Sequence, residues 1–251
     1  MFRKSSLVVT LAVTSWLVAT TCSADIITQW NFNSTVPDGL TTTGSTTPNV
    51  GAGTASLVGG TTATFASGGG STDPGVDDTG WNTTNYATQS TGNKSRGVQF
   101  AVSTRGYKDI SISWDQRHSN TSSRFVQFQY SLDGGNTFTD HTLFTHVGGG
   151  TWFNNQSIDL TSIAGANFNA QFVFRLVAAF DPAAGMYAAS LPESAATLYS
   201  DYAASGTWRF DMVTVRGIQT VPEPGTLALL GCGFASLVCV TVVRAGRRFS
   251  V

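Results

Sequence analysis

Apolar and polar residues alternate through five separate stretches of the chain, which leaves few folds open to it. The alternating apolar positions are Val98, Phe100 and Val102; Ile110, Ile112 and Trp114; Val126, Phe128 and Tyr130; Phe172, Phe174 and Leu176; and Trp208, Phe210 and Met212. A period of two places one face of a strand in a core and the other in water. Turn-forming residues separate these stretches, and no helical periodicity is visible between residues 25 and 220. The pattern predicts an all-β domain, an antiparallel two-sheet sandwich of jelly-roll type.

The predicted sandwich spans residues 25–220, which is one domain by length. Residues 25–33 alternate and are expected to form its first strand. Residues 34–97 are rich in serine, threonine and glycine, so we expect loops and short edge strands there, with some disorder. Residues 181–206 form a long connection between two predicted strands, and connections of this length often carry function.

The chain ends in a three-part pattern. Pro222, Glu223 and Pro224 precede the uncharged 17-residue run LALLGCGFASLVCVTVV at 227–243, and Arg244, Arg247 and Arg248 follow it. At about 1.5 Å per residue, a helix over this run spans roughly 25 Å, which is enough to cross a bilayer core. A helix in a soluble core would keep a polar stripe, and this run has none. The run therefore predicts one transmembrane helix, with the arginines as a stop-transfer cluster on the cytoplasmic side.

This pattern resembles the PEP-CTERM sorting signal of Gram-negative bacteria, here occupying residues 221–251. The resemblance implies that an exosortase, a membrane-embedded protease, recognises Pro222, Glu223 and Pro224 and cleaves near them. It further implies a protein that is anchored in the inner membrane in transit and then reaches the cell surface or the extracellular space. The resemblance says nothing about what residues 25–220 do.

Residues 1–24 have the organisation of a secretory signal peptide. Arg3 and Lys4 form a basic start, residues 7–19 are mostly apolar, and small residues precede the expected cut before Asp25. The export translocon is therefore an expected partner. The alternative is a lipoprotein signal in which Cys22 carries the lipid, but the residues before Cys22 match such signals poorly.

Charge and cysteine content limit the possible partners of residues 25–220. Of the 14 lysines and arginines, two precede this segment and three follow it, so nine lie inside it. Of the 15 acidic residues, only Glu223 lies outside it, so 14 lie inside. Its net charge is therefore about −5, which argues against a nucleic-acid partner. Cys22, Cys232 and Cys239 all lie outside it, so the exported domain has no internal disulfide and depends on its core.

Residues 131–138 read SLDGGNTF and are similar to the Asp-box, a β-hairpin motif. Its positions are held by Ser131, Asp133, Gly135, Thr137 and Phe138, with phenylalanine where tryptophan is usual. In such a hairpin the aspartate and serine side chains bond the turn backbone and the aromatic ring packs beneath. Sialidase propellers carry several copies of the motif, whereas this chain has one and no propeller repeat. The motif therefore indicates a structural hairpin.

The connection at residues 181–206 supplies the candidate ligand-binding residues, which are Tyr187, Tyr199, Asp201 and Tyr202. Tyrosines on a rigid sandwich can stack on sugar rings while an aspartate supplies hydrogen bonds. The alternative is a short capping helix over residues 183–202 whose tyrosines close the sandwich.

The last predicted strand contains an acidic residue among apolar ones. Its apolar phase shifts from Phe210 and Met212 to Val213 and Val215, which predicts a β-bulge or a strand buried on both faces. Asp211 is then a half-buried carboxylate that needs an arginine or a metal as partner. Since jelly-roll carbohydrate-binding modules often hold one structural calcium, Asp211 is a candidate calcium ligand.

Three further aspartates, Asp73, Asp77 and Asp78, lie close together in a glycine-rich stretch. Closely spaced aspartates in such a loop can hold calcium. Their spacing matches no calcium-binding motif, so a solvated loop is the favoured interpretation. No cofactor is expected beyond one structural calcium.

No catalytic residue is expected. His118, His141 and His146 lack the spacing of a zinc site, and Glu193 is the only glutamate between residues 25 and 220. The same segment has no cysteine nucleophile, no Gly-x-Ser-x-Gly motif and no evident carboxylate pair for a glycosidase.

We therefore expect a non-enzymatic cell-surface or matrix protein. Association with exopolysaccharide, or carbohydrate binding, is what the sorting resemblance implies. One alternative is a secreted polysaccharide hydrolase or lyase on the same sandwich. The other is a purely structural coat component.

Overall fold

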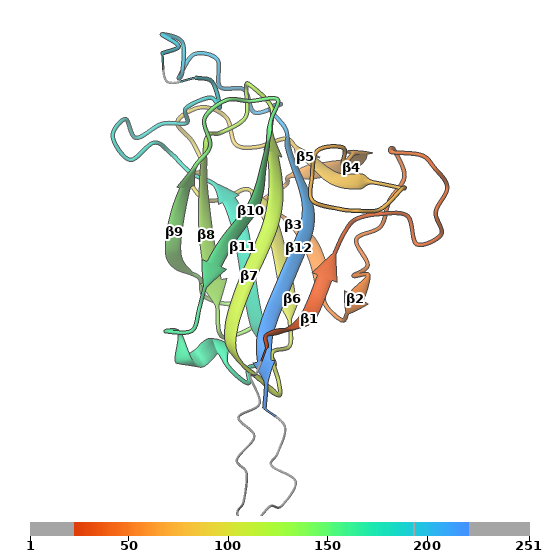
Figure 1. The fold of residues 1–251 in the computed structure, drawn as a ribbon. Coiled ribbons are helices and arrows are strands. Elements are labelled where there is room, and N and C mark those ends of the chain that lie inside the picture. The colour runs from red at the N-terminus through yellow and green to blue at the C-terminus, as the bar shows by residue number, and fades with distance from the viewer. Residues whose placement is uncertain (1–22, 193, 221–251) are drawn as a thin grey trace, which may run out of the picture.

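The computed structural model describes residues 23–192 and 194–220, which form a sandwich of two antiparallel sheets (Figure 1). The seven-stranded sheet contains β1 (Asp25–Trp30), β2 (Val50–Gly51), β4 (Thr62–Ser67), β5 (Thr79–Thr84), β7 (Tyr107–His118), β10 (Trp152–Asp159) and β12 (Trp208–Gln219). The five-stranded sheet contains β3 (Thr54–Val58), β6 (Gly97–Val102), β8 (Phe125–Ser131), β9 (Thr139–Thr145) and β11 (Phe172–Ala178). One short 3-10 helix, η1 (Ala164–Ala166), precedes β11.

The first sheet runs in the order β10-β7-β12-β1-β2, with β5 also paired to β12 and β4 paired to β5. The second runs in the order β3-β6-β11-β8-β9. The two-sheet, all-β prediction is confirmed. Within residues 34–97 the structure has the short strands β2 to β5, joined by loops.

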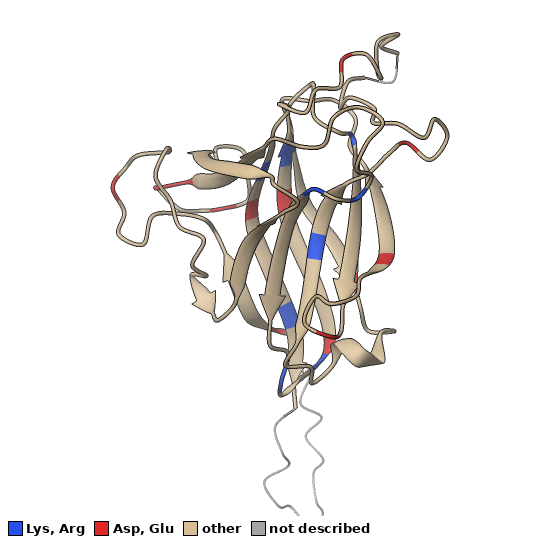
Figure 2. Ribbon diagram, turned by 180° about the vertical axis from the view of Figure 1, so that it is seen from behind, with Lys and Arg blue, Asp and Glu red and all other residues tan. Residues whose placement is uncertain are grey.

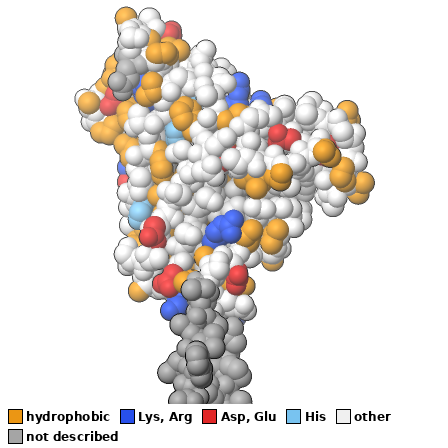
Figure 3. Space-filling view, viewed as in Figure 1, with side chains coloured by type: hydrophobic (Ala, Val, Ile, Leu, Met, Phe, Trp, Pro, Cys, Tyr) orange, Lys and Arg blue, Asp and Glu red, His pale blue; other side chains and the backbone are white. Residues whose placement is uncertain are grey.

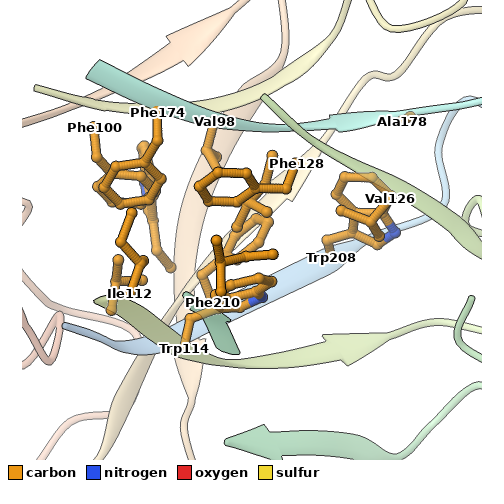
Figure 4. Close-up of a cluster of buried hydrophobic side chains, with 14 of the residues drawn as sticks. Val98, Phe100, Ile112, Trp114, Val126, Phe128, Phe174, Ala178, Trp208 and Phe210 are labelled. Atoms are coloured by element: carbon orange, nitrogen blue, oxygen red, sulfur yellow. The ribbon is translucent and has the colours of Figure 1, made fainter. Parts of the chain in front are cut away.

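The alternating apolar residues of both sheets meet in one core (Figure 4). Phe174 stacks between Phe100 and Phe128, with ring centroids 5.0 Å and 5.7 Å apart. Trp114, from the opposite sheet, stacks on Phe128 at 6.1 Å. Since all four side chains are buried, burial of aromatic surface holds the two sheets together.

The predicted irregularity in the last strand is a β-bulge. The pairing of β12 with β7 shifts between Asp211 and Thr214, and Met212 takes a left-handed backbone conformation with φ +48°. The bulge changes which side chains face inward, so Phe210 and Val213 are both fully buried.

The connection from β11 to β12 forms turns in the part that the structure describes, and no helix occurs in the described part of residues 183–202. The alternative of a capping helix there is thereby corrected. Isolated bridges, from Ser123 to Ala189 and from Asp181 to Met186, attach the connection to the sandwich and to itself.

The predictions for the two ends of the chain fall almost wholly outside the described residues. This applies to the signal peptide at 1–24 and to the transmembrane helix at 227–243 with its arginines. In residues 23–192 and 194–220, no helix has the length and apolar character that crossing a membrane requires.

Candidate ligand face and candidate metal centre

The outer face of the five-stranded sheet carries five polar residues in register, one on each strand. Ser56 pairs with Gln99, Gln99 with Arg175, Arg175 with Gln129, and Gln129 with Asp140. The residues beside them on the three central strands belong mostly to the core, so this set points away from it. We call these five residues the polar row. Figure 2 views the molecule from behind relative to Figure 1 and shows that the strands carry few charged residues, which lie far apart.

Gln129 joins the polar row into one network. Its side-chain oxygen accepts a hydrogen bond from Arg175 Nε, and its Nε2 donates to Asp140 Oδ1 at 2.5 Å. Lys94, from the loop before β6, forms an ion pair with the other oxygen of Asp140. Because Gln129 is only 6% exposed, its amide cannot rotate freely, and it holds Arg175 and Asp140 in place.

The polar row keeps unused hydrogen-bond donors. Among the described residues, the Gln99 amide and the two terminal nitrogens of Arg175 make no hydrogen bond. The Phe138 ring lies against the Arg175 guanidinium, with 3.7 Å from Cζ to the ring centroid. Burial lowers the pKa of the Arg175 guanidinium below its ordinary value, and the charge of Asp140 opposes this shift. A planar cation on an aromatic ring is thus presented beside a free amide.

The Asp-box-like hairpin positions this aromatic ring. Asp133 accepts hydrogen bonds from Thr137 N–H at 2.9 Å and from the Thr137 hydroxyl at 2.6 Å. The Ser131 hydroxyl donates to Asp133 and accepts from Gly135 N–H. The bonds from Thr137 and Ser131 lower the pKa of Asp133 to about 2. Asp133 is therefore ionised and able to accept these bonds at physiological pH, and Phe138 directly follows Thr137.

The structure separates the four candidate residues of the long connection. Tyr187 and Tyr202 are 0% and 7% exposed, stack on each other at 4.5 Å, and donate their hydroxyls to the Gly92 and Ala87 carbonyls. This burial corrects the expectation that these two rings stack on sugars, because amphipathic tyrosines can close a core once their hydroxyls find acceptors.

Tyr199 and Asp201 lie nearer the surface of the same connection. Tyr199 is 37% exposed and donates its hydroxyl to Asp181 Oδ2 at 2.9 Å. Asp201 is exposed and accepts a hydrogen bond from the Thr197 hydroxyl. Neither residue belongs to the polar row.

Asp211 lies in a group of carboxylates on the seven-stranded sheet. Asp73, Asp78 and Asp211 each offer one oxygen, and these oxygens lie within 4.8 Å of one another. Asp211 is fully buried and accepts hydrogen bonds from the Ser71 hydroxyl at 2.7 Å and from Met212 N–H. Burial raises the pKa of Asp211 to about 9. Burial, with the charge of Asp73, also raises the pKa of Asp78.

The donor set fits a hard cation. Calcium–oxygen distances of about 2.3–2.6 Å place oxygens on opposite sides of one ion roughly 5 Å apart, which the 4.8 Å limit satisfies. Asp78 Oδ1 is buried and has no hydrogen-bond partner among the described residues. Gly68 borders this oxygen so closely that a Cβ there would lie 1.7 Å from it. The three carboxylates would be ligands, and carbonyls or water would complete the shell.

A second carboxylate holds the loop that carries this group. Asp115, on β7, is 1% exposed and accepts from Thr72 N–H at 2.6 Å and from the Thr72 hydroxyl at 2.7 Å. Its other oxygen accepts from Asn155 N–H at 2.7 Å. Asp115 therefore fixes residues 71–73 beside Asp211.

The outer face of the seven-stranded sheet carries a small hollow. Figure 3 shows this face, on which charged side chains are few and hydrophobic ones gather on projecting loops. A hollow of about 100 Å³ lies there, with Asp115 and Arg216 in its lining. Ligand pockets usually measure roughly 300–1,000 Å³, so this hollow does not suit an oligosaccharide.

Sequence reasoning missed the polar row although a signal was present. Gln99, Arg175 and Gln129 occupy the outward phase of three strongly alternating stretches, where serine or threonine would suffice for solubility. Sequence reasoning also treated Asp73 and Asp78 as unrelated to Asp211. The two parts of the group lie more than 130 positions apart, and no local pattern predicts that they are in contact.

The comparisons with known proteins concern the two parts of the chain separately. The PEP-CTERM protein-sorting motif matches residues 220–248, so the predicted sorting motif is present. No curated protein matches this chain.

Several solved structures match this chain at low sequence identity. The CBM22-1 xylan-binding domain from Paenibacillus barcinonensis Xyn10C is 11% identical over 80% of this chain and 100% of that one, with a TM-score of 0.43. A xylan-binding domain from CBM 22 is 14% identical over 66% and 88%, with a TM-score of 0.38. A family 11 carbohydrate-binding module from Clostridium thermocellum is 13% identical over 78% and 100%, with a TM-score of 0.35.

Proposed function

We propose that the protein is exported to the cell surface or its surrounding matrix and binds a polysaccharide there through the polar row. The PEP-CTERM motif supports the first part, because it implies processing by an exosortase and sorting through the membrane. The second part rests on one observation, the hydrogen-bonded and in-register polar row with its unused donors.

The polar row suits an extended chain of hydroxyl groups. Four inter-strand spacings of about 4.8 Å give it a length of roughly 19 Å, enough for several sugar units. Gln99 and Arg175 offer planar donors that can bond two neighbouring hydroxyls at once, and Asp140 offers an acceptor. Because Gln129 already holds Arg175 and Asp140, little side-chain freedom is lost on binding.

Binding is favoured over hydrolysis on this face. A glycosidase needs two carboxyl groups about 5 Å or more apart across the bond that it cleaves. Asp140 is the one carboxylate of the polar row, and both its oxygens bond Gln129 or Lys94. A structural coat component would leave the free donors of Gln99 and Arg175 without a use.

We also propose one structural calcium at Asp73, Asp78 and Asp211. The support is the buried, unpartnered Asp78 Oδ1 beside a fully buried Asp211. The ion would offset two of the three negative charges and join residues 71–78 to β12. Its place on the seven-stranded sheet separates it from the polar row.

The experiment is a glycan array with the full-length chain in detergent, followed by calorimetry with the glycans that bind. Arg175→Ala is expected to weaken binding by about 1.5–3 kcal/mol, the range for hydrogen bonds to a charged group. Arg216→Ala, on the opposite sheet, is the matched control and should bind like wild type. No binding to any glycan, or equal loss in both variants, would remove the proposed role of the polar row.

A further inference from the structure

The last strand remains attached to the sandwich almost to the sorting motif. β12 pairs with β7 as far as Gln219 opposite Tyr107, and Thr220 N–H then donates to the Gly106 carbonyl at 2.9 Å. The Thr220 hydroxyl donates to the same carbonyl at 3.2 Å. The chain is therefore held by hydrogen bonds up to two residues before Pro222.

A large open hollow lies beside this exit. It measures about 520 Å³ and is lined by Arg105, Gly165 and residues 167–171. We call it the end cavity. Figure 1 shows η1, which belongs to the same loop, at the end of the sandwich where β12 stops. Tyr107 pairs with Gln219, the last residue of β12, and its backbone carbonyl accepts a hydrogen bond from Phe168 N–H at 2.9 Å. Tyr107 therefore contacts both the end of β12 and the end cavity.

The end cavity combines a cation, an aromatic ring and free amides. The exposed Arg105 side chain makes no ion pair or hydrogen bond within the described part of the chain. Phe168 is 52% exposed, so its ring is accessible to solvent. The side-chain nitrogens of Asn167 and Gln171 donate to no described residue. Apart from Asn167 Oδ1, which accepts Asp109 N–H, these side-chain groups make no hydrogen bond with the described residues.

The sorting motif matches these groups one by one. Glu223 is the only acidic residue after Thr220, and a carboxylate is the natural partner of a free arginine. Proline rings pack well on an exposed aromatic ring, and the carbonyls of an extended segment accept hydrogen bonds from amides. Three peptide steps lead from Thr220 to Glu223, at most about 11 Å of chain. Because Thr220 is hydrogen-bonded to Gly106, the neighbour of Arg105, the motif can reach Arg105.

We propose that the end cavity receives residues 222–224 of the same chain, with the Glu223 carboxylate on Arg105 and the proline rings on Phe168. The folded domain then holds the motif that the membrane protease must engage. Processing requires the protease to take the motif from the end cavity, so docking sets how quickly the tail is removed. The inference rests on the sorting motif and is independent of polysaccharide binding.

The test measures how fast a thiol beside the motif reacts in the full-length chain in detergent. Cys22, Cys232 and Cys239 are replaced by serine, and Val221→Cys supplies the thiol between Thr220 and the motif. Arg105→Glu is expected to raise the rate of maleimide labelling roughly two- to five-fold, the range that an exposed ion pair allows. Combining Arg105→Glu with Glu223→Arg is expected to restore the slow rate.

Two further variants keep the result specific. Lys108→Glu makes the same charge change at the same end, outside the end cavity, and is expected to leave the rate unchanged. Phe168→Ala should accelerate labelling without changing any charge. Equal rates in the parent and Arg105→Glu, or equal effects of Arg105→Glu and Lys108→Glu, would overturn the proposal. Protection that appears only in lipid nanodiscs would assign the end cavity to the membrane surface and would also overturn it.

Discussion

Replacing Asp211 by asparagine tests the metal centre through the pH dependence of folding. Burial raises the pKa of Asp211 from 3.8 to about 9 in the metal-free protein. The native state then keeps a proton that the unfolded chain releases, so the stabilising contribution is complete below pH 3.8 and is lost as pH rises to about 9. At 1.36 kcal/mol per pKa unit, the loss reaches about 4 kcal/mol at pH 7.

Asparagine keeps the shape of Asp211, cannot ionise, and can donate to the unpartnered Asp78 Oδ1. With EDTA at pH 7, Asp211→Asn is therefore expected to be about 4 kcal/mol more stable than wild type, or roughly 8–16 °C higher in Tm. At pH 4 the two proteins should melt together. Calcium at 100 times its Kd should stabilise wild type by about 2.7 kcal/mol and the variant far less.

The assay is calorimetric melting at pH 4, 7 and 8.5, each with EDTA and with calcium, because the difference between variants cancels the titration of other groups. Asp159→Asn, at an exposed carboxylate, is the control and should follow wild type under every condition. Parallel pH curves for wild type and Asp211→Asn in EDTA would refute the burial argument. An unchanged wild-type Tm on adding calcium would refute the metal site alone.

Three further changes test other parts of the structure. Burial lowers the pKa of His146 from 6.5 to about 4. The contribution of this residue to the free energy of unfolding is therefore present above pH 6.5 and is lost as pH falls to about 4. In urea titrations, His146→Gln should reduce the acid-induced loss of stability by about 3 kcal/mol. Phe174→Ala removes the ring between Phe100 and Phe128 and should cost about 3–5 kcal/mol in the same titrations, whereas a loss below 1 kcal/mol would contradict the stacked core. Gly68→Ala forces a methyl group against Asp78 and should abolish the calcium-dependent rise in Tm, an effect absent if Gly68 does not border the ion.

The sequence was most informative where local patterning and tertiary burial agree. The alternating stretches from Val98 to Leu176 became β6, β7, β8 and β11 because each strand has one face on the core. The phase shift around Asp211 likewise identified the bulge in β12. In both cases the signal lies within a few residues, and the physical cause is local as well.

Prediction failed where a partner lies far along the chain. β4, with the sequence TATFAS, has little strand signal of its own and owes its conformation to pairing with β5. Tyr187 and Tyr202 were expected at the surface because a sequence does not reveal that carbonyls about 95 and 115 positions earlier accept their hydroxyls. Long-range pairing of this kind decides burial without changing local composition.

In the proposed function the two sheets have different roles. β1 and β12, which lead to the two ends of the chain, both belong to the seven-stranded sheet, as does Asp211. The polar row lies wholly on the five-stranded sheet. Loss of the residues after Thr220, which the proposed processing would bring about, therefore removes no residue of the polar row and no strand of either sheet. Because the attachment and the proposed binding face lie on different sheets, the face that would bind polysaccharide is the same before and after the tail is processed.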